Sequence, residues 1–248
     1  MMRNAIFIYL ILSLEFIGCT EEVDTSEVIE DVILKPTEIE ADGTSTVAIT
    51  ARLNEKVDKR TVIFNTNQGK FKENEETKFS TEAKFIAKDS LVAYAELIAP
   101  STFGNEEIEI VTSLDLEDST YITKQTNIIT LLASEPSYIN LETNSFYVEN
   151  NYGSEIAITG FLKNSKGNGV SEGHKVKMED FDSNFDPLFG DFRNKDTISN
   201  SGSQVSAIYS PGFVQANQYM YIIATVYDLS PEETIIKDTL RIYIKENE

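Results

Sequence analysis

Residues 45–53 read STVAITARL and residues 154–162 read SEIAITGFL, and these two similar stretches decide the fold. In the first stretch every second residue is apolar: Val47, Ile49, Ala51 and Leu53. A period of two predicts a β-strand that buries one face. The stretches begin at positions 45 and 154, so they lie 109 residues apart. One small β-sandwich needs about 100 residues, so this spacing predicts a tandem pair of such domains.

The alternation continues along the rest of the chain. Further strand-like runs lie at residues 61–66, 91–97, 107–114 and 127–132. Turn sequences such as ADG and NQG separate the runs, and after residue 18 no stretch repeats apolar residues at helical spacing. The fold class is therefore predicted to be all-β. The two predicted domains cover residues 32–133 and 134–248 and meet at the sequence SEPS, residues 134–137.

Residues 1–18 have the features of a secretory leader. Arg3 precedes an unbroken apolar run at residues 5–14, which is shorter than the ~20 residues of a membrane-spanning helix. The run leads into FIGC, which resembles the bacterial lipobox, a motif whose cysteine is acylated and becomes the first residue of the mature protein. Cys19 is the only cysteine in the chain, and lipidation gives this lone exported thiol a role. An ordinary secretory signal or a short anchor helix is the alternative.

Residues 19–31 are predicted to form a lipidated acidic tether. Residues 20–31 (TEEVDTSEVIED) include six acidic residues and no basic one, so repulsion extends the segment. The acyl chains would bind the protein to a membrane, because each buried CH₂ contributes about 0.8 kcal/mol. An acidic stretch behind an acylated cysteine also resembles the surface-export signal of Bacteroidetes lipoproteins. The expected location is the cell outer membrane, with the protein facing either the surface or the periplasm.

Composition argues against whole classes of function. The formal net charge is −20 and the pI is near 4.4, so the surface repels nucleic acid. The single histidine is His174, and no GxSxG-type turn accompanies it as a serine nucleophile would require. His174 is instead expected to lie exposed at the junction of a turn and a strand. The chain is predicted to have no catalytic residues and no enzyme activity.

Residues 34–71 resemble the bacterial invasin/intimin Ig-like repeat. The repeat carries an ADG turn, then alternating valine and threonine, then V-x-F and G-x-L/F elements, which correspond here to Ala41-Asp42-Gly43, Val62-Ile63-Phe64 and Gly69-Lys70-Phe71. The second domain keeps the spacing but lacks the ADG turn. The resemblance implies immunoglobulin-like sandwiches in extracellular rods that present adhesive tips or act as spacers. It implies no enzyme activity and transfers no binding residue.

The acidic stretch at residues 179–191 (EDFDSNFDPLFGD) is a candidate calcium site, and calcium is the only cofactor that the sequence suggests. The candidate ligands are Asp180, Asp182, Asn184, Asp186 and Asp191. Calcium takes about six to eight oxygen ligands, which alternating side chains on a loop can supply. An EF-hand is excluded because Phe185 stands where that motif needs glycine. The alternative is a solvated loop whose phenylalanines, Phe181, Phe185 and Phe189, cover the edge of the core.

Residues 219–227 (YMYIIATVY) suggest a binding stripe. If the residues at even positions, Met220 to Val226, face the core, then Tyr219, Tyr221 and Tyr227 share the outer face. Exposed tyrosines suit binding because they bury a large area at low entropic cost. Cross-strand packing that only stabilises the sheet is the alternative.

Three functions remain open on this sequence. The first is a membrane-anchored envelope lipoprotein that acts in adhesion or as an extracellular scaffold or spacer, with an unknown protein or glycan ligand. The second is a structural subunit of an outer-membrane transport or secretion assembly, in contact with partners through edge strands. The third is a glycan-binding surface lipoprotein, although the chain contains no tryptophan.

Overall fold

A computed structural model describes residues 27–57, 60–87, 90–114, 123–151, 153–227 and 235–246. Within these ranges the chain forms strands and turns and no helix, so the all-β prediction is confirmed. Accordingly, none of the described residues belongs to a helix long and apolar enough to span a bilayer. The predicted leader and Cys19 lie outside the described residues.

The first domain is a sandwich of two sheets. Its strands are β1 (Ile29–Lys35), β2 (Glu38–Glu40), β3 (Thr46–Leu53), β4 (Thr61–Thr66), β5 (Lys70–Phe71), β6 (Lys78–Glu82), β7 (Lys84–Ala87), β8 (Ser90–Ile98), β9 (Glu107–Leu114) and β10 (Thr123–Leu132). One sheet has the order β1-β3-β8-β5, with β7 also paired to β8. The other has the order β2-β10-β9-β4-β6, in which β2 runs parallel to β10.

The second domain is a sandwich of the same kind. Its strands are β11 (Tyr138–Thr143), β12 (Tyr147–Glu149), β13 (Ile156–Lys163), β14 (Val176–Phe181), β15 (Asp191–Asp196), β16 (Gln204–Ser210), β17 (Gln218–Val226) and β18 (Lys237–Lys245). The sheets have the orders β11-β13-β16-β15 and β12-β18-β17-β14, and β12 runs parallel to β18.

The two domains share one topology. β3 and β13 carry the two similar stretches of sequence, and each is the second strand of its sheet. The neighbours of β3, which are β1 and β8, correspond to β11 and β16 beside β13. The short parallel pairs β2–β10 and β12–β18 also correspond. The sequence repeat is therefore a repeat of the complete sandwich.

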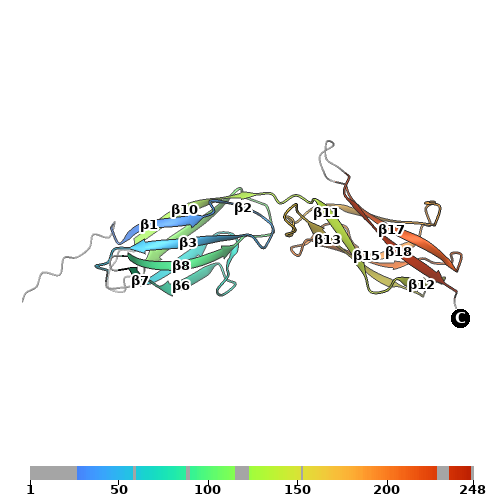
Figure 1. The fold of residues 1–248 in the computed structure, drawn as a ribbon, viewed down its shortest axis with the longest axis horizontal. Coiled ribbons are helices and arrows are strands. Elements are labelled where there is room, and N and C mark those ends of the chain that lie inside the picture. The colour runs from blue at the N-terminus through green and yellow to red at the C-terminus, as the bar shows by residue number, and fades with distance from the viewer. Residues whose placement is uncertain are drawn as a thin grey trace, which may run out of the picture.

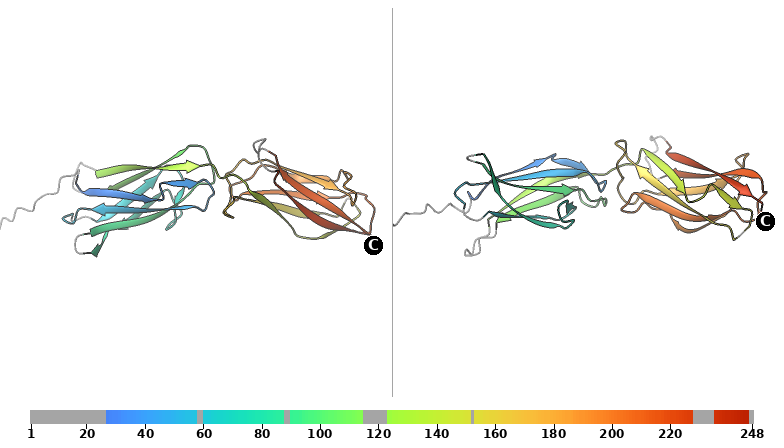
Figure 2. Two further views of the ribbon diagram at one scale, coloured as in Figure 1. Left: turned by 45° about the horizontal axis from the view of Figure 1, so that its top comes forward. Right: turned by 60° about the horizontal axis from the view of Figure 1, so that its bottom comes forward.

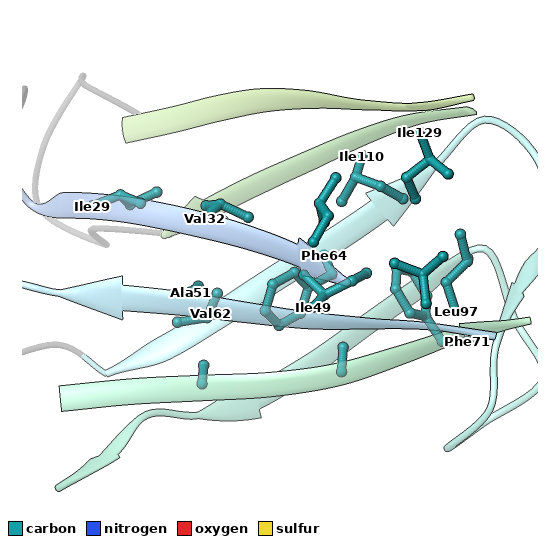
Figure 3. Packing of buried hydrophobic residues seen from close by; sticks show 14 of the residues in the cluster. Ile29, Val32, Ile49, Ala51, Val62, Phe64, Phe71, Leu97, Ile110 and Ile129 are labelled. Carbon is teal, nitrogen blue, oxygen red and sulfur yellow. The ribbon is translucent and has the colours of Figure 1, made fainter. Parts of the chain in front are cut away.

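Each domain has its own hydrophobic core. In the first domain the cluster extends from Val28 to Leu131, and in the second from Ile139 to Ile244. Figure 3 shows Phe64 and Phe71 between the two sheets of the first domain, with ring centroids 6.3 Å apart. The buried positions of β3 are every second residue, as its sequence predicted.

The two cores fill an equivalent position in different ways. Ala51 of β3 lies opposite Ala93 of β8, whereas Gly160 of β13 lies opposite Val205 of β16. A Cβ on Gly160 would lie 2.9 Å from the Val205 side chain. The glycine therefore makes room for the larger valine, and the pair conserves approximate volume.

The first domain, predicted to begin at residue 32, begins earlier, with strand β1. It starts at Ile29, and both Val28 and Ile29 are buried in the core of the first domain. The register of β1 against β3 shifts between Ile29 and Asp31, which marks a β-bulge. A bulge inserts an extra residue and breaks the two-residue alternation, so the pattern conceals this end of the strand. The predicted tether at residues 19–31 is too long, because its last three residues belong to β1.

The two domains lie end to end along the long axis of the molecule (Figure 1). β1 begins at the end of the first domain that points away from the second, and β18 ends at the opposite extremity of the molecule (Figure 1). Two further views show the same arrangement (Figure 2). Whatever precedes β1 is therefore attached at one extremity, and the second domain forms the other.

We predict that Gly160→Ala lowers the free energy of unfolding of the second domain by about 1–3 kcal/mol, because the added carbon overpacks the core. Chemical denaturation measures the change. Adding Val205→Ala recreates the alanine pair of the first domain and should recover part of the loss. Gly104→Ala is the control, since its Cβ would meet nothing within 4 Å. A Gly160→Ala variant as stable as the wild type would contradict the packing described above.

Candidate functional site

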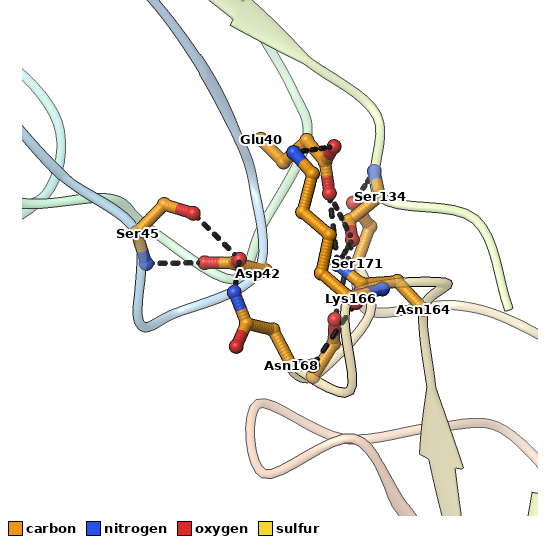
Figure 4. A network of polar contacts seen from close by, with 9 residues as sticks. Glu40, Asp42, Ser45, Ser134, Asn164, Lys166, Asn168 and Ser171 are labelled. Carbon is orange, nitrogen blue, oxygen red and sulfur yellow. Dashed lines mark hydrogen bonds and ion pairs between the residues drawn. The ribbon is translucent and has the colours of Figure 1, made fainter. Parts of the chain in front are cut away.

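The turn at residues 41–45 of the first domain packs against the second domain (Figure 4). Asp42 of this ADG turn is only 3% exposed. Its Oδ1 accepts hydrogen bonds from the amides of Thr44 (2.8 Å) and Ser45 (2.6 Å), and its Oδ2 accepts one from the Ser45 hydroxyl (2.7 Å). Asn168 of the second domain donates from Nδ2 to the same Oδ2 at 3.0 Å. Asp42 thus joins its own turn to the other domain.

The surroundings of Asp42 favour its charged form. Burial, the largest single effect, raises the pKa of this carboxyl. Hydrogen bonds from the amide and hydroxyl of Ser45, the amide of Thr44 and the side chain of Asn168 together outweigh burial, so the pKa of Asp42 lies below its ordinary value. The junction therefore contains a buried carboxylate that is fully provided with donors.

Glu40, the last residue of β2, binds a second group of donors from the second domain. Its Oε1 lies 2.7 Å from Lys166 Nζ, and its Oε2 accepts a hydrogen bond of 2.8 Å from Asn164 Nδ2. Asn164 is buried, and its Nδ2 also donates to the Ser134 hydroxyl at 3.1 Å. Because Lys166 is exposed to solvent, the buried amide of Asn164 is the stronger of the two links.

The connection between the domains is itself held in place. Ser134 donates its amide to Ser171 Oγ at 2.9 Å, and its carbonyl accepts the amide of Ser171 at 2.9 Å. The Ser171 hydroxyl then donates to the carbonyl of Ala41 in the first domain at 3.0 Å. Both serines are buried. The connection is therefore bonded to the second domain, and through Ser171 it is linked back to the first.

A third contact lies at the loop that follows β8. The amide of Glu172 donates to the carbonyl of Ser101 at 2.9 Å, and the Glu172 carboxylate accepts hydrogen bonds from the hydroxyls of Ser101 (3.3 Å) and Thr102 (3.1 Å). Nearby, a Cβ on Gly169 would lie 2.9 Å from the carbonyl oxygen of Asp42, so the two backbones approach closely. Contacts made by several separate segments oppose bending at the junction.

His174 also lies at the junction, and the prediction that it is exposed is wrong. Its side chain is 12% exposed, with Nε2 3.3 Å from the carbonyl oxygen of Ser134 and 3.8 Å from the Glu135 carboxylate. Its amide donates to the Ser199 hydroxyl at 3.0 Å. The sequence did not reveal the position of His174 at the junction, because Ser134, Glu135 and Ser199 are distant from His174 in the sequence.

The outer side of the sheet β12-β18-β17-β14 carries an aromatic face. We define this face by the aromatic residues Tyr147, Tyr219, Tyr221, Tyr243 and Phe185 together with the cations Arg241 and Lys245. Met220, Ile222, Ala224 and Val226 are buried, so the tyrosines of β17 point outward as the sequence predicted. Tyr219, Tyr243 and Tyr147 lie side by side on three adjacent strands.

Stacking orders the side chains of the aromatic face. The rings of Tyr219 and Tyr243 meet edge to face at 5.3 Å, and Phe185 stacks on Tyr221 at 5.1 Å. The Arg241 guanidinium lies 3.6 Å from the centre of the Tyr219 ring, and Lys245 Nζ lies 3.5 Å from that of Tyr147. Such cation–π contacts contribute about 0.5–1 kcal/mol each at exposed sites.

Tyr227 does not belong to this face. It follows the other end of β17, eight residues from Tyr219, which corresponds to about 26 Å along an extended strand. Its amide donates to the carbonyl of Lys175 at 3.1 Å. The predicted stripe of Tyr219, Tyr221 and Tyr227 is therefore divided, and the structure adds Tyr147 and Tyr243 from strands that sequence periodicity on β17 alone did not connect.

The predicted calcium ligands are not brought together. Asp180 is buried, and its Oδ2 accepts hydrogen bonds from the Tyr209 hydroxyl (2.7 Å) and the Gly190 amide (2.8 Å). Burial, with the neighbouring charge of Asp180, raises the pKa of the Tyr209 hydroxyl far above its usual range. Asp182 caps its own turn through the amides of Asn184 (2.7 Å) and Asp186 (2.9 Å). Asp191 instead lies 3.2 Å from Arg193 Nε.

Accordingly, no group of three or more His, Cys, Asp or Glu side chains in the described part of the chain is placed to hold a metal ion. The alternative for this loop also needs correction. Phe189 is 88% exposed and Phe185 is 60% exposed, so neither covers the edge of the core. Asp180 instead supports the loop from inside the sandwich.

Comparison with known proteins shows the fold. No protein-family model and no curated protein matches the sequence. Among solved structures, invasin, a bacterial integrin-binding protein, is 12% identical with a TM-score of 0.54, and the match covers 88% of this chain and 39% of invasin. The adhesin InvE of Yersinia pseudotuberculosis is 14% identical with a TM-score of 0.41, covering 91% of this chain and 61% of InvE.

The D0–D1 domain of intimin is 15% identical with a TM-score of 0.32, and the match covers 87% of this chain and 98% of that fragment. This chain spans less than two thirds of the invasin and InvE structures. Identities this low establish the fold alone. The fold is the invasin/intimin-like bacterial Ig-like β-sandwich, as the resemblance of residues 34–71 predicted.

We predict that Asp42 makes the stability of the first domain depend on pH. The pKa of an aspartate in the unfolded chain is near 3.8, and the pKa of Asp42 in the folded protein is lower. Such a carboxyl stabilises the fold at pH values above the unfolded-state pKa. This contribution is lost as the pH falls through the folded-state pKa. Below about pH 4 the wild type should therefore lose its stability advantage over Asp42→Asn. Thermal melts between pH 2 and 6, run on both proteins, measure the difference.

Asp31→Asn, on an exposed position of β1, controls for the removal of one negative charge from an acidic chain. A constant difference in melting temperature between wild type and Asp42→Asn across this pH range would contradict the assignment.

Proposed function

We propose that this chain is a lipid-anchored rod of the cell envelope that acts in adhesion or as an extracellular spacer and catalyses no reaction. The observation that carries this proposal is the junction of Glu40, Asp42 and Ser134 with Asn164, Asn168 and Ser171. Domains joined by a small polar interface usually move relative to one another. Here buried polar groups are paired across the interface, and separating the domains would break several hydrogen bonds together, each with a net contribution of about 0.5–1.5 kcal/mol.

A fixed junction suits a protein that holds one end away from a surface. We propose acylation at Cys19 after removal of residues 1–18, followed by the residues that precede β1 as a short acidic tether. The membrane then lies beyond the outer end of the first domain. The second domain, with its aromatic face, is presented at the greatest distance from the anchor.

The comparison with invasin supports adhesion as the class of activity. Invasin is an integrin-binding protein and shares the sandwich fold of this chain. At 12% identity this similarity says nothing about which ligand is bound. The ligand of this chain has to be inferred from its own exposed residues, among which the aromatic face of the second domain is the strongest candidate.

We predict that the wild-type chain, produced in a Gram-negative host, incorporates a clickable palmitate analogue and sediments with the outer membrane. Cys19→Ser should abolish labelling and release the protein into the soluble envelope fraction, because no second cysteine can replace the acylation site. Gel fluorescence and membrane fractionation measure the two effects.

Ser26→Ala, a change of similar size in the same N-terminal segment, is the control and should leave both readouts unchanged. An unlabelled wild type, or a Cys19→Ser protein that stays in the membrane fraction, would refute the lipid anchor.

A further inference from the structure

We infer that the aromatic face of the second domain binds an anionic polysaccharide built from sugar acids. This inference rests on the proposed function, which places that domain away from the membrane. It adds the chemistry of the ligand, and it depends on three features of the face: its charge, its rings and its rigidity.

The aromatic face lies on the side of a sheet whose charge is opposite to that of the chain. On the part of this outer side that carries the aromatic face, the strands place two cations, Arg241 and Lys245, and one carboxylate, Glu149. Lys237 and Lys177 lie farther along the sheet, and Lys177 is paired with Glu179 at 2.6 Å. The chain as a whole carries 41 acidic and 21 basic residues. A local excess of positive charge on such a chain favours a negatively charged ligand.

Arg241 and Lys245 are available to such a ligand. Both are exposed, and each lies over a tyrosine ring; neither forms an ion pair with a carboxylate of the described residues. A guanidinium that stacks on a ring keeps its N–H groups at the edge, where they can bind a carboxylate in bidentate fashion. The two cations lie four residues apart on β18, or about 13 Å at ~3.3 Å per residue. One small anion cannot reach both, whereas a polymer with repeated carboxylates can.

The tyrosines supply the second half of the recognition. Tyr219, Tyr243 and Tyr147 occupy adjacent strands about 4.8 Å apart, so their side chains form a continuous row across the sheet. The C–H faces of sugar rings are apolar and pack against aromatic rings, while tyrosine hydroxyls can bond to sugar hydroxyls. An acidic peptide would satisfy the cations but would leave this row of rings without matched apolar surfaces. A sugar-acid polymer satisfies both.

The Phe185 side of the face is held in place before any ligand binds. Phe185 stacks on Tyr221 although its φ of 66° is in the left-handed region, which a bulky side chain rarely adopts. Its loop is held by Asp182, which accepts two backbone amides, and by Asp180 beneath it. A strained residue that remains 60% exposed gains little from burial, and such strain is concentrated at functional sites. A pre-ordered face binds with a smaller loss of entropy.

The negative net charge of the chain does not prevent an anionic polysaccharide from binding to the aromatic face. At physiological ionic strength, charges separated by more than about 8 Å are largely screened. A polymer at the face therefore interacts chiefly with the nearby charges, which are Arg241, Lys245 and Glu149. Distant carboxylates reduce its approach rate but contribute little to the bound state.

Three polymers separate the contributions of charge and sugar rings. Titration calorimetry with the full chain in mild detergent should show binding of polygalacturonate, which has both features. Dextran has sugar rings without charge, and poly-L-glutamate has charge without sugar rings; each should bind at least about tenfold more weakly, a difference of about 1.4 kcal/mol.

Two variants test the residues. Arg241→Gln should weaken polygalacturonate binding about tenfold, because it removes a charge-assisted pair. Tyr147→Ala combined with Tyr219→Ala should weaken it by a similar factor. The matched control is Tyr94→Ala with Arg52→Gln, which removes an exposed tyrosine and an arginine from the outer side of the first domain's sheet and should leave binding unchanged. Unchanged melting temperatures verify that each variant folds.

Equal binding of poly-L-glutamate would assign the face to acidic protein segments and overturn the inference. Equal binding of dextran would show that the cations are not used, and it would also overturn the inference. Absence of polygalacturonate binding, or full binding by both face variants, would do the same. None of these results affects the labelling of Cys19, so failure of the inference is distinguishable from failure of the proposed function.

Discussion

The structure depends on one constraint, which is that polar groups removed from water must find partners. At the junction, Asp42, Ser134, Asn164 and Ser171 are all buried. Their hydrogen bonds run between the two domains and to the connection that joins them. Any bend that opens the junction would break several of these bonds together, among them the bond from Asn168 to the Asp42 carboxylate. The junction therefore behaves as a single network, in which each hydrogen bond stabilises the others.

This constraint links the fold to the function. Two sandwiches with separate cores are two independent packing units, and a flexible connection between them would permit many orientations. The paired junction selects one orientation and gives the molecule defined extremities (Figure 1). The segment proposed to carry the lipid enters at one extremity. The aromatic face belongs to the domain at the other, so the proposed anchor and the proposed binding surface would be separated by the length of the molecule.

The sequence predicted what short-range patterns encode. Alternation in β3 and its repeat in β13 predicted the strands, the sandwiches and the tandem arrangement, because burial on one face requires a period of two. The β-bulge in β1 broke that period, and the start of the first domain was placed too late, at residue 32. The junction was not predicted, since Asp42 and Asn168 are 126 residues apart and nothing local to either residue identifies the other. The ADG turn was noticed as a family feature, while its contact with the next domain required the structure. The calcium site predicted in the acidic loop was not found for a related reason. Spacing alone cannot show that Asp180 points into the core and that Asp182 caps its own turn.

The fixed junction is tested most directly by the distance between the two domains in solution. Spin labels at Tyr94→Cys and Thr239→Cys, in a Cys19→Ser background, place one label on each domain. Double electron–electron resonance spectroscopy then measures the distribution of distances between the two labels. The account predicts one narrow distribution in the parent protein and a broad one when Asn164→Ala and Asn168→Ala are added. A broad distribution in the parent protein would contradict it.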